Sequence, residues 1–184
     1  MLAKVLSSAV LGVDAYIVEV EVDIRHGLPG FNTVGLPEAA VKESKDRVKS
    51  AINNSGYRFP DDRITVNLAP ADIKKEGTGF DLPIAIGILT ATGVVPQNML
   101  SEYLILGELS LDGRIKPLKG SLPVALSAKN SGLRGIIVPK QNAREAAVVN
   151  GIGVLPVLNL AELVQFLCGL TAIRPESIDV ETIF

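Results

Sequence analysis

The chain has 184 residues and a net charge of −2, with one cysteine, one histidine and 47% hydrophobic residues. This composition predicts a folded globular chain, and Cys168 alone excludes an intrachain disulfide or a cysteine metal cluster, so we expect a cytoplasmic setting. The lone His26 argues against a histidine-based triad or zinc site, and no apolar run is long enough to span a bilayer. The net charge argues against nucleic-acid binding through overall charge, but it leaves room for a local basic patch.

The N-terminal segment predicts an antiparallel hairpin. Residues 2–10 and 13–24 alternate in hydrophobicity as strands do, and Gly12 suits the turn between them. In the second strand the apolar residues share one face and the acidic residues share the other, which indicates one buried and one solvated face. The members of the apolar face are Tyr16, Val18, Val20, Val22 and Ile24. A loop rich in glycine and proline follows, with a short strand near residues 31–34.

A helix is predicted from Pro37 to near Gly56, because proline is favoured early in a helix and glycine just past its end. On this helix Lys42, Lys45 and Lys49 are spaced i, i+3 and i+7, which aligns them on one face. Acidic residues alternate with these lysines. A solvated face is therefore the plain structural interpretation, beside a binding role.

The rest of the chain alternates between strands and helices. A strand at 63–69 precedes a second helix, which is apolar nearly all round and therefore buried; Asp81 is its expected N-cap. Asn159 and Glu162 form a weak capping box before the last helix. Further strands are predicted at 103–109, 114–117, 135–139 and 153–158, and further helices at 121–130, 141–150 and 160–167. We expect one α+β domain over residues 1–170, followed by a linker at 171–184.

Ordered strings of motifs give the most specific signal. The glycine loop and helix KKEGTGFDLPIAIGIL (74–89) and the string GELSLDGRIKPLKG (107–120), followed by a helix and a buried strand ending in Val-Pro, resemble the Lon-protease proteolytic domain. That domain belongs to the left-handed βαβ superfamily, which is ribosomal protein domain 2-like. With VGLPEAAVKESKDRVKSAI (34–52) and NLAPAD (67–72) added, the chain resembles the N-terminal domain of the magnesium-chelatase-like AAA+ ATPases, the YifB/ComM family.

This resemblance implies that an ATPase module, which binds ATP and Mg²⁺, begins beyond Phe184. No G-x-x-x-x-G-K-[ST] phosphate loop occurs in the 184 residues, so we expect neither a cofactor nor a metal to bind here. The resemblance further implies a motor for DNA branch migration, in recombination or natural transformation. In such a motor this domain is expected to help the chain assemble with its own copies into a ring, as a hexamer.

The resemblance also locates the positions of a lost catalytic dyad. A Lon-type peptidase uses a serine whose proton is taken by a lysine of lowered pKa. Its motifs place the serine at Gly79 and the lysine at Leu122, so both groups are missing and we expect no proteolysis. The alternative is a residual serine/threonine–lysine peptidase. The substitute pairs that neighbouring residues offer are Thr78 with Lys75 and Ser121 with Lys119, although Ser121 is more simply a helix N-cap.

A second hypothesis gives the domain a direct contact with DNA. The candidates are basic residues of the first helix, the glycine loop and the turn near residue 113: Lys42, Lys45, Lys49, Lys74, Lys75, Arg114, Lys116 and Lys119. Stacking aromatics are scarce, with no Trp, three Tyr and five Phe. The expected partners are therefore further copies of the chain and DNA, and no membrane.

Overall fold

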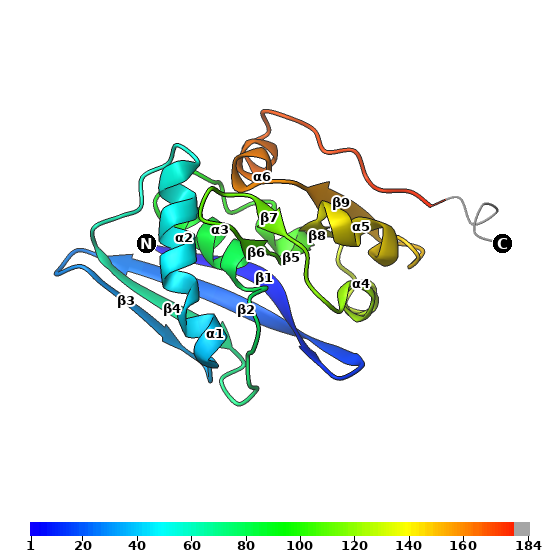
Figure 1. The fold of residues 1–184 in the computed structure, drawn as a ribbon, viewed down its shortest axis with the longest axis horizontal. Coiled ribbons are helices and arrows are strands. Elements are labelled where there is room, and N and C mark those ends of the chain that lie inside the picture. The colour runs from blue at the N-terminus through cyan, green and yellow to red at the C-terminus, as the bar shows by residue number, and fades with distance from the viewer. Residues whose placement is uncertain (179–184) are drawn as a thin grey trace.

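A seven-stranded sheet organises the computed structural model, which describes residues 1–178 (Figure 1). The strand order is β3-β4-β2-β1-β5-β8-β9. The strands are β1 (Leu2–Leu11), β2 (Asp14–Arg25), β3 (Gly30–Val34), β4 (Arg63–Ala69), β5 (Tyr103–Ile105), β8 (Gly135–Pro139) and β9 (Gly153–Val157). The β1–β2 and β2–β4 pairs are antiparallel and the other four pairs are parallel. The fold is thus a mixed α/β structure with a mostly parallel sheet. The predicted α+β class would instead have a mainly antiparallel sheet.

The predicted hairpin is confirmed. Its pairing runs from Leu2 opposite Asp23 to Leu11 opposite Asp14, and Gly12 has a φ of +64° in the turn, a region that glycine occupies without steric cost. Val18, Val20 and Val22 are fully buried as expected, but Tyr16 is 41% exposed. It is exposed because it lies close to the tip of the hairpin, which projects beyond the helices (Figure 1).

Helices cover the two faces of the sheet unequally. The larger apolar cluster joins the sheet to α2 (Ser44–Asn54), α3 (Asp81–Ala91) and α6 (Leu160–Leu167). The smaller cluster joins it to α4 (Ser121–Asn130) and α5 (Lys140–Ala146). Neighbouring residues such as Leu104 and Ile105 enter different clusters, because successive strand side chains point to opposite faces. The central parallel strands are therefore buried on both sides.

Two predicted elements are divided in the structure. The prediction of one continuous helix from residue 37 to 56 is wrong: the segment forms two helices, α1 (Ala39–Lys42) and α2. The carbonyl of Ala40, which a continuous helix would offer to the N–H four residues later, accepts a hydrogen bond from Arg47 Nη2 at 3.0 Å. The strand predicted at 103–109 is β5 plus a separate strand, β6 (Glu108–Leu109), which pairs with β7 (Ile115–Lys116) in a small second sheet.

Gly107 separates β5 from β6, because its backbone groups bond to the glycine loop instead of continuing a strand. Its N–H donates to the Gly79 carbonyl at 3.0 Å, and its carbonyl accepts from Leu82 N–H at 3.0 Å. These bonds hold the start of α3 against the strand end. The remaining elements agree with the prediction, apart from a short 3₁₀ helix at Leu100–Glu102 and an α5 that ends earlier than expected.

The segment after α6 packs on the domain where a linker was predicted. The N-cap of α6 is confirmed, since Asn159 Oδ1 accepts from Glu162 N–H at 2.8 Å. Beyond the helix, Ile173 packs against the larger cluster and Glu176 N–H donates to the Val154 carbonyl of β9 at 2.8 Å (Figure 1). Residues 171–178 therefore cover the outer edge of β9. The rest of the predicted linker, 179–184, lies outside the described residues.

Candidate functional site

The glycine loop before α3 borders a hollow of about 360 Å³. Thr78, Gly79 and Phe80 form one wall, and Leu118 and Lys119 form another. A Cβ on Gly79 would lie 3.3 Å from Leu118 Cδ2, so the two motif segments lie side by side. Leu122 packs, like Leu118, against the smaller apolar cluster. The fold thus brings the two segments that should have carried a dyad together around one hollow.

The substitute pairs proposed for this hollow do not form. Ser121 is fully buried, and its Oγ donates to Glu145 Oε2 at 2.9 Å. It is not the N-cap of α4, because Gly120 holds that position with a left-handed φ of +90°. Lys119 is exposed at the rim.

Lys75 is buried beneath the glycine loop, which corrects its assignment as a nucleic-acid contact. Its side chain is 0% exposed, and its Nζ donates to the carbonyls of Gly35, at 2.7 Å, and Pro70. Its backbone pairs with the segment before α1: Lys75 N–H donates to the Leu36 carbonyl, and Glu38 N–H donates to the Lys75 carbonyl. Burial lowers the pKa of the Lys75 amine. The amine is therefore used in holding two loops together, and neither a phosphate nor Thr78 is its partner.

Replacing Lys75 with methionine is expected to lower the free energy of unfolding by about 1–3 kcal/mol at neutral pH, because two buried carbonyls lose their donor. A lowered folded pKa means that the unfolded state binds more protons between that pKa and the ordinary value of 10.5. The wild type should therefore gain stability over Lys75→Met as the pH rises through this window. Urea unfolding at several pH values measures the difference.

Lys74→Met is the matched control for that substitution. Lys74 is exposed and pairs with Glu38 at 3.7 Å, and exposed ion pairs contribute about 0–1 kcal/mol. Equal losses of stability in the two variants, with no pH dependence in the difference, would contradict the role given to Lys75.

A largely buried ion pair at the start of α3 was not predicted from the sequence. Asp81 does not cap α3; the N-cap position belongs to Phe80. The Asp81 carboxylate accepts from Arg47 Nε at 2.7 Å and Nη2 at 3.0 Å, and from Leu109 N–H at 3.1 Å. Burial raises the pKa of Asp81, while the hydrogen bonds from Arg47 and Leu109 oppose that rise. Arg47 thus ties α1 and α2 to the start of α3, and Asp81 in turn ties that start to β6. In the sequence, the only sign of this role is the position of Arg47 among the charged residues of the helix.

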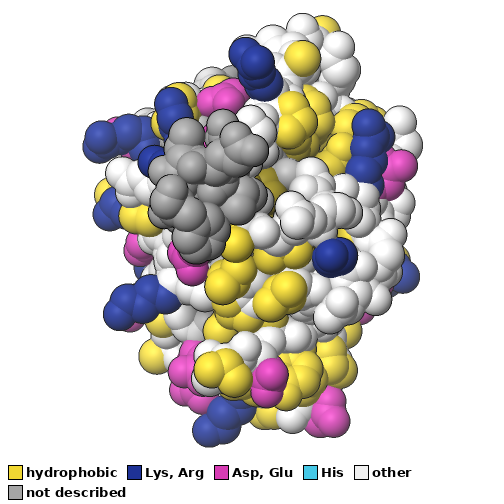
Figure 2. Space-filling model, turned by 90° about the vertical axis from the view of Figure 1, so that its right-hand side faces the viewer, with side chains coloured by type: hydrophobic (Ala, Val, Ile, Leu, Met, Phe, Trp, Pro, Cys, Tyr) yellow, Lys and Arg dark blue, Asp and Glu magenta, His cyan; other side chains and the backbone are white. Residues whose placement is uncertain are grey.

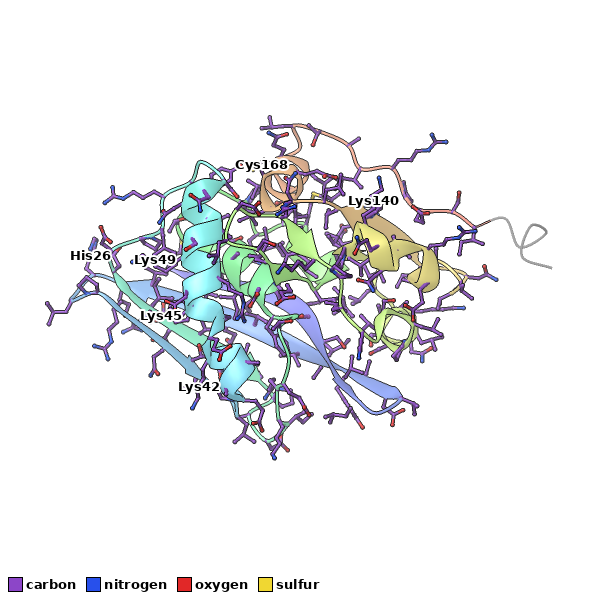
Figure 3. All side chains as sticks on the ribbon, in the orientation of Figure 1. His26, Lys42, Lys45, Lys49, Lys140 and Cys168 are labelled. Atoms are coloured by element: carbon purple, nitrogen blue, oxygen red, sulfur yellow. The ribbon has the colours of Figure 1, made fainter. Side chains whose placement is uncertain are left out.

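The remaining basic candidates are exposed and fall in different places. Lys42, Lys45 and Lys49 lie along the side of α1 and α2 that faces β3 (Figure 3). Arg114 Nε lies 2.9 Å from Asp112 Oδ2, so this charge is already partnered. The other exposed candidates are Lys74, Lys116 and Lys119. The helix stripe is therefore the part of the predicted basic patch that the fold keeps together.

Residues 1–178 contain neither a metal-binding cluster nor a membrane-spanning helix. Within them, His, Cys, Asp and Glu side chains form no group of three that could hold a metal ion. Within the same residues, every helix is too short or too polar to cross a bilayer.

The fold and the hollow together define a mixed α/β domain in which the glycine loop before α3 and the segment before α4 lie on either side of one hollow. The family model described as "Subunit ChlI of Mg-chelatase" matches residues 20–142, and the chain belongs to this family. It is 48% identical over 179 residues to the uncharacterized protein YifB of Escherichia coli, covering 97% of this chain and 35% of that protein. It is 47% identical over 168 residues to the competence protein ComM of Haemophilus influenzae, covering 91% of this chain and 33% of that protein.

More distant similarity connects the chain to peptidases. Lon protease 2 of Bacillus subtilis is 27% identical over 129 residues, which cover 70% of this chain and 23% of that protein. The chain spans about a third of the length of YifB and ComM, and it corresponds to their N-terminal part. The resemblance to the YifB/ComM family that was inferred from the motifs is therefore confirmed.

Proposed function

We propose that this chain is a non-proteolytic accessory domain of a AAA+ ATPase, with the left-handed βαβ fold of Lon-type proteolytic domains. The observation that carries the proposal is the hollow at Gly79. Its glycine loop and its facing segment are in place, yet among residues 1–178 no hydroxyl that lines the hollow is bonded to a lysine amine. Nucleophilic catalysis needs a nucleophile and a base within hydrogen-bonding reach. The similarity to Lon protease 2 and the membership of the ChlI family support the fold and the ATPase context.

The proposal also concerns longer proteins of the YifB and ComM type. Their length leaves room for an ATPase module that binds ATP and Mg²⁺. The name of ComM connects that protein with competence, which supports a DNA motor acting in natural transformation or recombination, with branch migration as its activity. In this proposal the domain contributes to ring assembly with its own copies and, through the lysine stripe on α1 and α2, to DNA contact.

Two exposed apolar side chains at one end of the domain support self-assembly. Val13, at the hairpin tip, is 88% exposed, and Leu126 on α4 is 46% exposed. They line a hollow of about 310 Å³ between the hairpin tip and α4. Figure 2 shows the end of the molecule that carries these elements, with apolar side chains gathered in a band and charges of both signs around them. The lining of the hollow also includes Asp14, Ser127 and Asn130, so this surface combines apolar and polar side chains, as interfaces between separately folded chains do. A second copy of the chain is the partner proposed here.

Sedimentation of the longer protein with and without residues 1–170 tests the proposed assembly role. The complete protein should form a ring, and the truncated one should sediment as smaller species. Leu126→Glu should weaken assembly at least tenfold, since a buried unpaired charge costs more than about 1.4 kcal/mol. Lys129→Glu, on the same helix but outside this hollow, is the control. Unchanged assembly after removal of residues 1–170 would exclude the proposed role.

Peptide hydrolysis tests the alternative of a residual peptidase. Incubation with fluorogenic casein is expected to give no turnover above the blank, because the Lys75 amine and the Ser121 hydroxyl are bonded elsewhere. Thr78, which lines the hollow, is the one remaining hydroxyl of the two substitute pairs. Turnover that Thr78→Ala abolished would restore the peptidase hypothesis.

A further inference from the structure

A third hollow lies beside the lysine stripe, between α2, β3 and the loop before β4. It measures about 140 Å³, and its lining includes Phe31, Phe59, Lys45 and Lys49. Figure 3 shows Lys45 and Lys49 on the side of α2 that faces β3. The hollow thus combines aromatic and basic side chains that come from three separate segments of the chain.

An aromatic pair forms the apolar part of this hollow. The rings of Phe31 and Phe59 are stacked, with centroids 6.4 Å apart and planes inclined by 22°. Both side chains pack against the larger apolar cluster but keep part of their surface exposed. The Nζ of Lys49 lies 5.9 Å from the centroid of Phe59. Two of the five phenylalanines of the chain therefore meet beside the basic stripe, and an aromatic face next to cations is a platform on which a nucleobase can stack.

The charges around the hollow favour a negative ligand on the α2 side. Neither Lys45 nor Lys49 has a carboxylate within 4.0 Å of its amine among residues 1–178. Two acidic residues lie at the opposite rim: Asp61 is 3.8 Å from Arg58, and Asp62 is 3.5 Å from the His26 ring. The lysine amines are thus available for phosphates, while Asp61 and Asp62 keep phosphates away from the loop side.

From these contacts we propose that the hollow binds an unpaired base of single-stranded nucleic acid, with the base stacked on Phe59 and Phe31 and the flanking phosphates on Lys45 and Lys49. This inference rests on the proposed DNA contact and specifies its substrate class. Bases within a duplex are stacked on one another and present only their edges in the grooves. A single strand, by contrast, offers the base face that the aromatic pair requires.

Fluorescence anisotropy with a fluorescein-labelled single-stranded oligodeoxynucleotide, and with the same strand made abasic, tests the inference. Loss of one stacked base costs roughly 5- to 150-fold in affinity. Phe59→Ala should cause such a loss on the intact strand and no further loss on the abasic strand. Phe59→Leu, which keeps the apolar packing but removes the aromatic face, should behave in the same way. Phe166→Ala, a half-buried phenylalanine of α6 outside the hollow, is the matched control.

Lys45 and Lys49 are expected to affect the salt dependence of binding, whereas Phe59 affects the discrimination between intact and abasic strands. Lys45→Gln combined with Lys49→Gln should reduce the slope of log affinity against log salt concentration by roughly 1.4, since two phosphates lose their cations. Phe59→Ala should leave that slope unchanged. If Phe59→Ala weakened binding of the intact and abasic strands equally, the base-stacking inference would be wrong while the proposed DNA contact would stand. The same conclusion would follow if binding depended on the lysines but not on Phe59. If the unmodified chain bound no oligonucleotide, the base site and the proposed DNA contact would both be wrong.

Discussion

Replacing Arg47 with methionine is expected to lower the free energy of unfolding by about 3–5 kcal/mol at neutral pH. The substitution keeps an apolar stem of similar length but leaves Asp81 as a buried carboxylate whose remaining donor is Leu109 N–H. Removing one partner of a buried ion pair is costly, because the other charge stays desolvated without compensation. The loss also frees the Ala40 carbonyl and detaches α2 from the start of α3. Urea denaturation followed by circular dichroism measures the change.

The cost of Arg47→Met should depend on pH with a definite sign. Burial already raises the pKa of Asp81 above its ordinary value of 3.8, and Arg47 opposes that rise. Without Arg47 the folded pKa is higher still, so the folded state binds more protons than the unfolded state between 3.8 and that pKa. Stability of the variant should therefore fall as the pH rises through this window, and the difference from wild type should be smaller at low pH than at neutral pH.

Arg25→Met provides a matched control for Arg47→Met. Arg25 also pairs with an aspartate, Asp23, at 2.8 Å, but its side chain is 80% exposed. An exposed pair of this kind is worth about 0–1 kcal/mol. A similar small loss for both arginines would show that the Arg47–Asp81 pair does not hold α2 against the start of α3 as described.

Gly35→Ala is expected to lower the free energy of unfolding by more than about 4 kcal/mol, or to prevent folding. A Cβ at this position would lie 2.2 Å from the Leu68 carbonyl oxygen, and the backbone φ is +103°. Both the clash with backbone and the left-handed conformation oppose any side chain. Because the Gly35 carbonyl also accepts from Lys75 Nζ, movement of this residue would release the buried amine. Thermal unfolding monitored by circular dichroism tests the expectation.

Gly56→Ala separates the effect of the backbone clash from the effect of the left-handed conformation. Gly56 has a comparable φ of +90°, but a Cβ there would meet nothing within 4 Å. It should cost about 1–2 kcal/mol from the left-handed conformation alone. If Gly35→Ala were no more destabilising than Gly56→Ala, the close approach between residues 35 and 68 would have no energetic importance.

Much of the secondary structure could be predicted because it depends on local periodicity. The alternation of β1 and β2, the nearly all-apolar sequence of α3 and the Asn159 cap are each properties of a few neighbouring residues. The division of the first helix at Glu43 could not be predicted in this way. It accompanies a hydrogen bond from Arg47 to the Ala40 carbonyl, and that arginine is positioned by Asp81, which lies far along the chain.

The sequence by itself determined that Gly79 has no nucleophile and Leu122 no base, since a missing side chain needs no structure to be recognised. Only the tertiary structure decided that Lys75 is buried while its neighbour Lys74 is exposed, and that Phe31 and Phe59 stack beside the lysine stripe. The reason is physical: whether one polar or aromatic side chain is buried depends on which distant carbonyls and rings the fold places around it. These partners are distant in the sequence, so the periodicity of neighbouring residues does not identify them.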